Sequence, residues 1–216
     1  TSELVIDDAA RAGADFLCFP ATFLSGYGTA EIVAKNAISV DDPRLLALAT
    51  RSGRHDLVTI MGISERRQDG RLANTAAVLA NGKVLGTYSK TMLTGGDRDM
   101  KFCAGETRPV FEAKGVRFGI IICHDSSFPE VAAIYSWKGA QVLFSPHFNH
   151  LPPAKMDSHR IQVRNNHVGI AAHYGLVVVR ANVVMSGARE GCLSYGDSAI
   201  FGPDGDSLHA GEFLYK

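Results

Sequence analysis

The sequence has no excess of charge of either sign and no long hydrophobic run. Lysine plus arginine and aspartate plus glutamate number 22 each among 216 residues, and no basic run stands out. The chain therefore lacks the positive patch that predicts binding to nucleic acid or to an anionic membrane surface. Its apolar stretches are shorter than the roughly 20 residues that a membrane-spanning helix needs. Neither a nucleic acid nor a membrane is an expected partner.

Paired cysteines are also lacking. The four cysteines are widely spaced and form no Cys-x-x-Cys pair: Cys18, Cys103, Cys123 and Cys192. This spacing argues against a disulfide framework and favours a reduced, cytoplasmic setting. His147, His150 and His159 lie in one stretch, but a structural zinc site normally has a tighter grouping of cysteine and histidine. We therefore expect no metal and no other cofactor.

The chain does have enough apolar content to form a core. Hydrophobic residues make up 46% of it and charged residues 20%, which favours one folded α/β domain over residues 1–216. Both ends look cut, because the chain begins within a predicted helix with no strand before it and stops without a closing element. The expectation is a single domain that lacks its first strand and its C-terminal end.

The first half of the sequence predicts helices and an antiparallel meander. Helices are expected at residues 2–12 and at Pro43–Arg54, where the proline suits the first turn. The expected strands are Asp15–Phe19, Leu57–Ser64, Leu72–Ala80 and Lys83–Ser89, with a hairpin turn at Asn81-Gly82. The polar segment Thr91–Arg108 is too long for a simple connector and indicates a functional loop.

In the second half, strands and helices alternate. Helices are expected at about 129–138 and 157–174. The expected strands are Val116–Cys123, Gln141–Ser145, Leu176–Asn182, Gly196–Phe201 and a short last strand after the turn at 202–205. Alternation of this kind predicts helices layered on a sheet, and the hairpins make the sheet mixed.

Cys123 is the strongest candidate for chemistry. It ends the apolar run that begins at Val116 and precedes a turn and Pro129, which suits the first turn of a helix with a serine before it as a cap. A cysteine between a strand end and a helix N-terminus favours the thiolate, so Cys123 is a predicted nucleophile. Its neighbour His124 is a poor base, since adjacent residues on a strand point to opposite faces. The backbone N–H of His124 could still donate to an oxyanion.

Lys90 is the second candidate, because it stands where the strand Lys83–Ser89 enters the long polar segment. A solvated lysine at a strand end is the alternative. Three separated motifs together resemble the carbon–nitrogen hydrolase family of nitrilases and amidases: Gly13–Tyr27, Tyr88-Ser89-Lys90 and Cys123–Glu130. The similarity extends over essentially the whole chain, including residues 139–143, 178–182 and 197–205.

The resemblance implies an α-β-β-α sandwich with mixed sheets and a Glu–Lys–Cys triad. In such enzymes the cysteine attacks a nitrile, amide or carbamoyl carbon, ammonia or an amine leaves, and water hydrolyses the thioester. Cys123 matches the nucleophile, and Lys90 matches the residue that stabilises the tetrahedral intermediate. The backbone N–H of His124 matches the other oxyanion donor. The family also commonly forms dimers or larger homo-oligomers, which is an expectation by analogy.

The triad glutamate has no match. The family's Phe-Pro-Glu motif reads Phe19-Pro20-Ala21 here, and the methyl group of Ala21 can neither accept nor donate a proton. General acid–base catalysis is typically worth about 10²–10⁴-fold, so we expect the activity of this chain to be abolished or severely reduced. Asp97 and Asp99 are candidates for a further glutamate that many members carry after the lysine. Surface ion pairs are the alternative for both.

The residues after the nucleophile give hints about the substrate. His124-Asp125 resembles the amidase and carbamoylase branches more than the nitrilases proper. Ser126 and Ser127 stand where members that bind a substrate carboxylate often have arginines, so a free α-carboxylate is not the expected feature. The expected substrate is a small amide or carbamoyl compound, and a nitrile is a further option.

Further pocket residues are expected after the next strand. His147, Phe148 and Asn149 follow it and are predicted to line the substrate site together with Ser126 and the loop aspartates. Simple packing is the alternative for His147. Two other functions stay open: a non-catalytic binding module on the same scaffold, and a redox-sensing thiol at Cys123.

Overall fold

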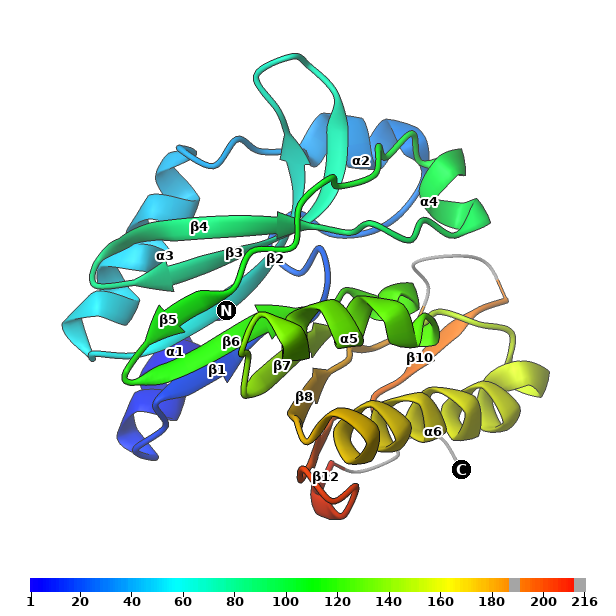
Figure 1. The fold of residues 1–216 in the computed structure, drawn as a ribbon. Coiled ribbons are helices and arrows are strands. Elements are labelled where there is room, and N and C mark those ends of the chain that lie inside the picture. The colour runs from blue at the N-terminus through cyan, green and yellow to red at the C-terminus, as the bar shows by residue number, and fades with distance from the viewer. Residues whose placement is uncertain (187–190, 212–216) are drawn as a thin grey trace. The chain divides into compact units, whose positions relative to one another are not determined.

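The structure is a computed structural model, and it describes residues 1–186 and 191–211. The chain has an α/β fold with two mixed sheets, which confirms the predicted fold class (Figure 1). It divides into two compact units, one of residues 1–107 and 113–115 and the other of residues 108–112 and 116–216. Each unit supplies residues that the sequence marks as candidates.

The first unit is built on a sheet with the strand order β1-β2-β3-β4. Its strands are β1 (Phe16–Cys18), β2 (Val58–Arg66), β3 (Leu72–Ala80) and β4 (Lys83–Ser89). Its helices are α1 (Ser2–Arg11), α2 (Ala30–Asn36), α3 (Pro43–Arg54) and α4 (Gly95–Asp99). β1 runs parallel to β2, whereas β2, β3 and β4 form the antiparallel meander that the sequence predicts.

Local sequence explains two of these features. Asn81 and Gly82 have φ angles of 53° and 75°, the left-handed conformations that a type I′ hairpin turn requires at both of its central positions. Helix α3 begins at Pro43, as predicted, and the side chain of Asp42 accepts a hydrogen bond from the backbone N–H of Arg44 at 2.9 Å. Helices α2 and α4 were not predicted, because each is too short to show a helical period.

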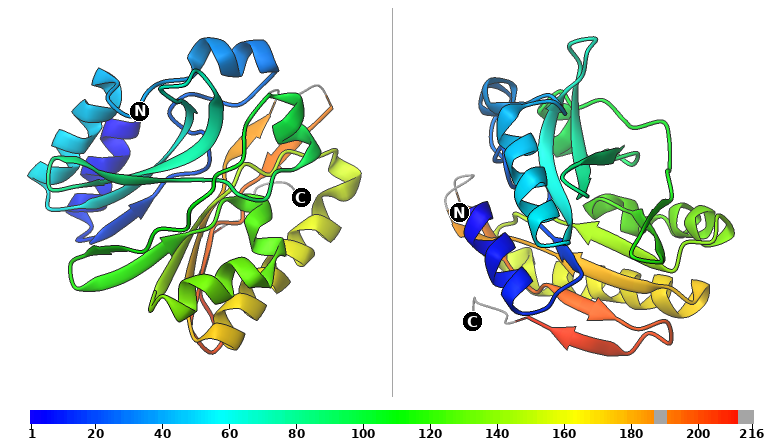
Figure 2. Two further views of the ribbon diagram at one scale, coloured as in Figure 1. Left: turned by 45° about the horizontal axis from the view of Figure 1, so that its top comes forward. Right: turned by 90° about the vertical axis from the view of Figure 1, so that its left-hand side faces the viewer.

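Helices α1 and α3 lie on the same side of this sheet, and α3 packs against β2, β3 and β4 (Figure 2). The core under them contains Ile6 of α1, Leu45 of α3 and Met61 and Ile63 of β2. Because side chains alternate along a strand, the intervening positions of β2 and β3 lie on the opposite face of the sheet. That face carries the paired residues Ser64 and Asn74.

The second unit is built on a sheet with the strand order β12-β11-β8-β7-β6-β5. Its strands are β5 (Phe111–Ala113), β6 (Val116–Ile120), β7 (Val142–Pro146), β8 (Val177–Ala181), β11 (Ala199–Phe201) and β12 (Ser207–Ala210). The helical elements are η1 (Cys123–Ser127), α5 (Pro129–Trp137), η2 (Pro153–Lys155) and α6 (Met156–Tyr174), and a separate antiparallel pair consists of β9 (Val184–Ser186) and β10 (Leu193–Tyr195). β6, β7 and β8 are parallel neighbours, as alternating strands and helices predict.

The predicted boundaries in this unit need correction. Strand β6 ends at Ile120, not at Cys123, because the chain turns into the 3₁₀ segment η1. Helix α5 begins at Pro129, as predicted, but its N-cap is Phe128 and not a serine. The strand expected at Gly196–Phe201 is shorter in the structure, where β11 begins only at Ala199. Strands β5, β9 and β10 were missed, since three residues are too few to show alternation.

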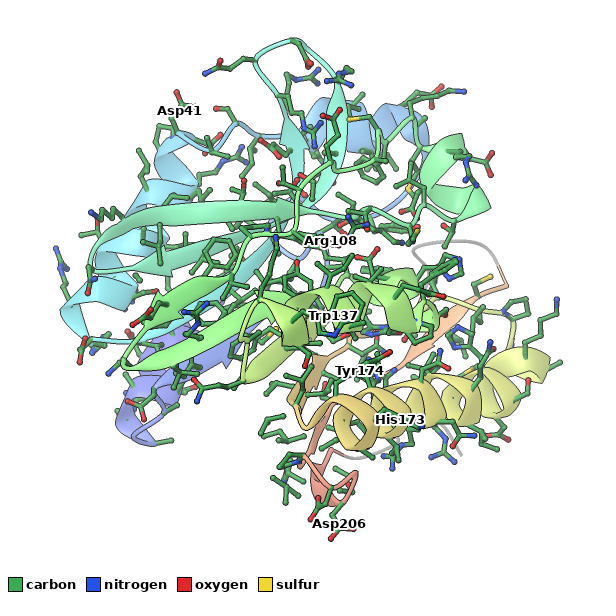
Figure 3. All side chains as sticks on the ribbon, viewed as in Figure 1. Asp41, Arg108, Trp137, His173, Tyr174 and Asp206 are labelled. Atoms are coloured by element: carbon green, nitrogen blue, oxygen red, sulfur yellow. The ribbon has the colours of Figure 1, made fainter. Side chains whose placement is uncertain are left out.

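Helices α5 and α6 contact each other along the outside of the second sheet (Figure 1). Trp137 at the end of α5 is 82% exposed, and His173 and Tyr174 mark the end of α6 (Figure 3). Helix α6 stops at Gly175, whose φ of 63° is the left-handed conformation that glycine adopts at little cost. Among the described residues, no helix has the length and apolar character to cross a membrane.

Candidate active site

Lys90 is a buried residue of the first unit, which contradicts the alternative of a solvated lysine. Directly after β4, its backbone N–H donates to the carbonyl oxygen of Asn74 at 2.9 Å. Its side chain is 3% exposed. A buried ammonium group is costly unless it has a counterion, and the carboxylate of Asp97 lies 2.6 Å from Nζ.

Asp97 is held by α4, within the segment that was predicted as a loop. Its Oδ2 also accepts hydrogen bonds from the backbone N–H of Thr94 at 2.8 Å and from the hydroxyl of Thr94 at 2.7 Å. Burial raises the pKa of Asp97, but the charge of Lys90 and the hydrogen bonds from Lys90 and Thr94 outweigh it and lower this pKa overall. Asp99 is exposed, so of the two loop aspartates only Asp97 is placed against Lys90.

A threonine followed three residues later by an acidic residue is the sequence signature of a capping box. Thr94 and Asp97 form this box, in which each side chain binds the backbone N–H of the other residue. The pattern could have identified both α4 and the buried aspartate from the sequence.

Ala21 lies in the loop after β1 and is 1% exposed. Its neighbour Thr22 has a φ of 51°, in the left-handed region that non-glycine residues seldom adopt. A Cβ atom at Gly62 of β2 would overlap the carbonyl oxygen of Pro20 and come within 2.6 Å of the Thr22 nitrogen. The loop is therefore pressed directly onto β2, and the residue at position 21 has a fixed backbone position.

Cys123 of the second unit is the first residue of η1 and has a φ of 49°. A left-handed cysteine is a strained conformation that persists only where surrounding contacts impose it. The hydroxyl of Ser126 donates to the carbonyl oxygen of Cys123 at 2.8 Å, and Asp125 accepts from the backbone N–H of Ile122 at 2.8 Å. Cys123 and His124 lie in this 3₁₀ turn and not on a strand. The alternation of side chains along a strand, because of which His124 was expected to be a poor base, therefore does not hold here.

Asn149 contacts the predicted nucleophile. Its Nδ2 donates to the sulfur of Cys123 over 3.5 Å, and its backbone N–H donates to the side-chain oxygen of Asn182 at 3.0 Å. Phe148, the residue before it, is partly buried, and its ring lies 5.9 Å from that of His150. Asn149, one of the three residues expected to line the pocket after β7, is therefore joined to Cys123 by a hydrogen bond.

His147 belongs to a buried polar cluster in the second unit. Its Nε2 lies 2.9 Å from the hydroxyl of Ser145, and the Nε2 of His167 lies 3.0 Å from the same hydroxyl. All three side chains are fully buried. Burial and the charge of Arg180 hold the pKa of His167 well below its usual value of 6.5. The cluster therefore contains a histidine that is neutral when the protein is folded.

This cluster predicts a pH dependence of stability. Above about pH 6.5, His167 is neutral in both the folded and the unfolded protein. Below this pH, His167 takes up a proton in the unfolded chain but not in the folded protein. We expect the free energy of unfolding to fall by about 1 kcal/mol between pH 6.5 and pH 5.5 from this group. Urea unfolding at both pH values measures this fall in the free energy of unfolding. The fall should be smaller in His167→Gln, which has no imidazole to protonate. His173→Gln, at an exposed position of the same helix, should show the same fall as the unchanged protein. A fall in His167→Gln as large as that of the unchanged protein contradicts the prediction.

Sequence reasoning did not assign a role to Arg180 or Asp197. Arg180 is fully buried, and its Nη1 lies 2.6 Å from Oδ2 of Asp197. Arg164 of α6 donates to the same carboxylate at 3.0 Å. A charged residue inside the apolar strand β8 is the signal that could have found this ion pair, because buried charges require partners.

Comparison with known proteins places the chain in a family. The carbon-nitrogen hydrolase family matches residues 1–212. A protein of Pseudomonas protegens described as "Hydrolase in pqqF 5'region" is 33% identical over 201 residues, which cover 90% of this chain and 67% of that protein. An (R)-stereoselective amidase from a Pseudomonas species is 28% identical over 194 residues, covering 90% of this chain and 68% of the amidase.

Solved structures show the same fold. Nit3 from Saccharomyces cerevisiae, described as a member of branch 10 of the nitrilase superfamily, superimposes with a TM-score of 0.85 at 19% identity, over 98% of this chain and 78% of Nit3. The match over nearly the whole chain and the identity to the Pseudomonas protegens hydrolase agree with the motifs around Lys90 and Cys123. The chain belongs to the carbon-nitrogen hydrolase family.

Proposed function

We propose that the site is built to hydrolyse a non-peptide carbon–nitrogen bond through a thioester on Cys123, and that Ala21 abolishes or severely reduces this activity. The observation that carries the proposal is the setting of Cys123 in a left-handed turn with the amide of Asn149 against its sulfur. The amidase among the relatives supports an amide-type substrate. A carbamoyl compound is included, and a nitrile is a further option.

The proposed reaction has two halves. The thiolate of Cys123 attacks the carbonyl carbon, a carbon–sulfur bond forms, and the oxygen takes the negative charge. Lys90 and the backbone N–H of His124 have the proposed role of stabilising this oxyanion. The carbon–nitrogen bond then breaks and the nitrogen leaves with a proton as ammonia or an amine. Water attacks the thioester, which releases the acid and restores the thiol.

Both halves require a group that carries protons. A base must take the proton of the thiol and later that of water, and an acid must protonate the leaving nitrogen. Position 21 has a methyl group that can do neither. Asp97 is not a replacement in this proposal, because its lowered pKa and its bonds to Lys90 and Thr94 make it a weak base. Its proposed role is to hold the ammonium group of Lys90 in place.

Mass analysis of the protein tests this proposal. The chain and its Ala21→Glu form are incubated with a panel of small amides, carbamoyl compounds and nitriles, and the peptide containing Cys123 is analysed. We expect an acyl group on Cys123 with at least one amide or carbamoyl compound. A folded Ala21→Glu form that acquires no adduct and releases no ammonia or amine with any of them contradicts the proposal.

A non-catalytic binding module is the second candidate, and Ala21 favours it, since binding needs no proton carrier. Such a module would bind the same class of small molecule with or without the sulfur. Calorimetric titration of the Cys123→Ser form with the panel separates the two candidates. Unchanged binding in that form, together with an inactive Ala21→Glu form, supports the module. A homo-oligomeric assembly stays an expectation, which sedimentation can measure.

A further inference from the structure

The amide of Asn149 lies between the sulfur of Cys123 and the guanidinium group of Arg180. Its Nδ2 donates to the sulfur over 3.5 Å, and its Oδ1 accepts from Nη2 of Arg180 at 2.9 Å. A guanidinium group has donors and no acceptor. The atom of Asn149 that faces it must therefore be the oxygen, and the NH₂ group must face the sulfur.

Arg180 is itself fixed on several sides. It is fully buried, and its Nη1 donates to the carboxylate of Asp197 at 2.6 Å and to the backbone oxygen of the same residue. Its guanidinium carbon lies 5.6 Å from the centre of the Tyr195 ring, a favourable place for a cation. The hydroxyl of Tyr195 donates a second, longer bond of 3.3 Å to Oδ1 of Asn149. The oxygen of the amide thus has two donors that hold its orientation.

The backbone of Asn149 is held as firmly as its side chain. Asn182, at the end of β8, accepts from the Asn149 backbone N–H at 3.0 Å and donates through Nδ2 to the carbonyl oxygen of Gly196 at 2.6 Å. Side-chain orientation and backbone position are therefore set by groups from different segments. A donor that is fixed in advance costs little further ordering when charge develops on the sulfur.

We propose that Arg180 is a positioning residue for the nucleophile, which orients Asn149 so that its amide N–H stabilises the thiolate of Cys123 over the thiol. The inference rests on the proposed function for the role of Cys123, but it does not require turnover. A hydrogen bond to a charged acceptor is stronger than one to a neutral acceptor. The oriented donor therefore lowers the pH at which Cys123 ionises.

The rate of Cys123 alkylation by iodoacetamide, measured from pH 5 to pH 10 in the full chain, tests this inference. The adduct is followed on the peptide that contains Cys123, so that the other cysteines do not contribute. We expect Asn149→Leu and Arg180→Met each to raise the pH midpoint of the rate by about one unit, which is about a tenfold loss of rate below the midpoint. In Asn149→Asp a carboxylate oxygen replaces the donor, and we expect at least as large a rise.

Arg164→Met is the matched control. Arg164 binds the same carboxylate of Asp197, but among the described residues no hydrogen bond joins it to Asn149. Its loss should therefore leave the pH midpoint of Cys123 alkylation equal, within error, to that of the unchanged protein. Thermal unfolding establishes that each variant is folded. If Arg180→Met does not fold, the two Asn149 variants decide the question. Midpoints that stay unchanged in folded Asn149→Leu and Asn149→Asp overturn the inference, whatever the acyl-adduct experiment shows, because alkylation requires no hydrolysis.

Discussion

Replacing Ala21 with glutamate should raise kcat/KM for a small amide by about 10²-fold or more, the lower end of what a general acid–base group contributes. The loop that carries position 21 is pressed onto β2 at Gly62, so a new side chain there starts from a fixed backbone. Position 21 is also buried, and burial raises the pKa of a carboxyl group towards the range that suits proton transfer near neutral pH. Release of ammonia or amine measures the gain.

Ala21→Gln is the matched control for this experiment. Glutamine has the same shape as glutamate but does not transfer protons, so its rate should stay at the background of the native chain. A folded Ala21→Glu form no faster than Ala21→Gln on every compound of the panel contradicts the view that the missing base limits this chain. Thermal unfolding of both variants ensures that the comparison is made between folded proteins.

Asp97→Asn should destabilise the protein by about 3 kcal/mol, because it removes the carboxylate that forms an ion pair with the buried ammonium group of Lys90. Lys90 and Asp97 are 3% and 1% exposed, so solvent screens this pair little. Urea unfolding at pH 7 measures the loss. Asp99→Asn, at an exposed position of the same helix, should change stability by less than about 0.5 kcal/mol.

The ion pair of Lys90 and Asp97 also determines how the free energy of unfolding changes with pH. The pKa of Asp97 is lowered in the folded protein. The ionised carboxylate therefore contributes fully to stability above the usual pKa of 3.8, and this contribution is lost as the pH falls through the lowered pKa. The double variant Lys90→Met/Asp97→Leu should recover part of the stability that Asp97→Asn loses, since it removes both charges. An Asp97→Asn form as stable as the native chain contradicts the assignment of a buried pair.

The sequence predicted regular elements well where their pattern was long. Strands β3 and β4 and helix α3 have the predicted bounds, because alternation, the Asn81-Gly82 turn and the proline at position 43 are local signals. The burial of Lys90 could not be read in this way. It depends on Asp97, whose helix is too short to show a period and is identified only by its capping box.

The turn at Cys123 shows a different limit of sequence reasoning. The apolar run continues past Ile120, where β6 ends, and Ile121 and Ile122 are fully buried outside the strand. Hydrophobicity reports burial, so it could not distinguish a strand from the approach to a buried turn. Asp125 and Ser126 form hydrogen bonds around the left-handed Cys123, and no recognisable pattern in the sequence predicts these contacts.

The contacts of Asn149 depend on residues that are distant in the sequence. Arg180 and Asp197 were visible as parts of family-like motifs, but their ion pair follows from the pairing of β8 with β11. Cross-strand register is set by tertiary packing, which one sequence without relatives does not reveal. The sequence therefore marks Cys123 as a candidate nucleophile, which stays a prediction, whereas it gives no sign of the groups that orient the surroundings of Cys123.

The central claim is that Cys123 is the nucleophile of a site that lacks its proton carrier. Rapid acid quenching of the Ala21→Glu form during turnover of an amide, followed by peptide mass analysis, tests this claim most directly. The account predicts an acyl group on Cys123 and on none of Cys18, Cys103 or Cys192, and no turnover when Cys123→Ala is added to Ala21→Glu. Turnover that survives Cys123→Ala, or an acyl group found on another residue instead, contradicts the account.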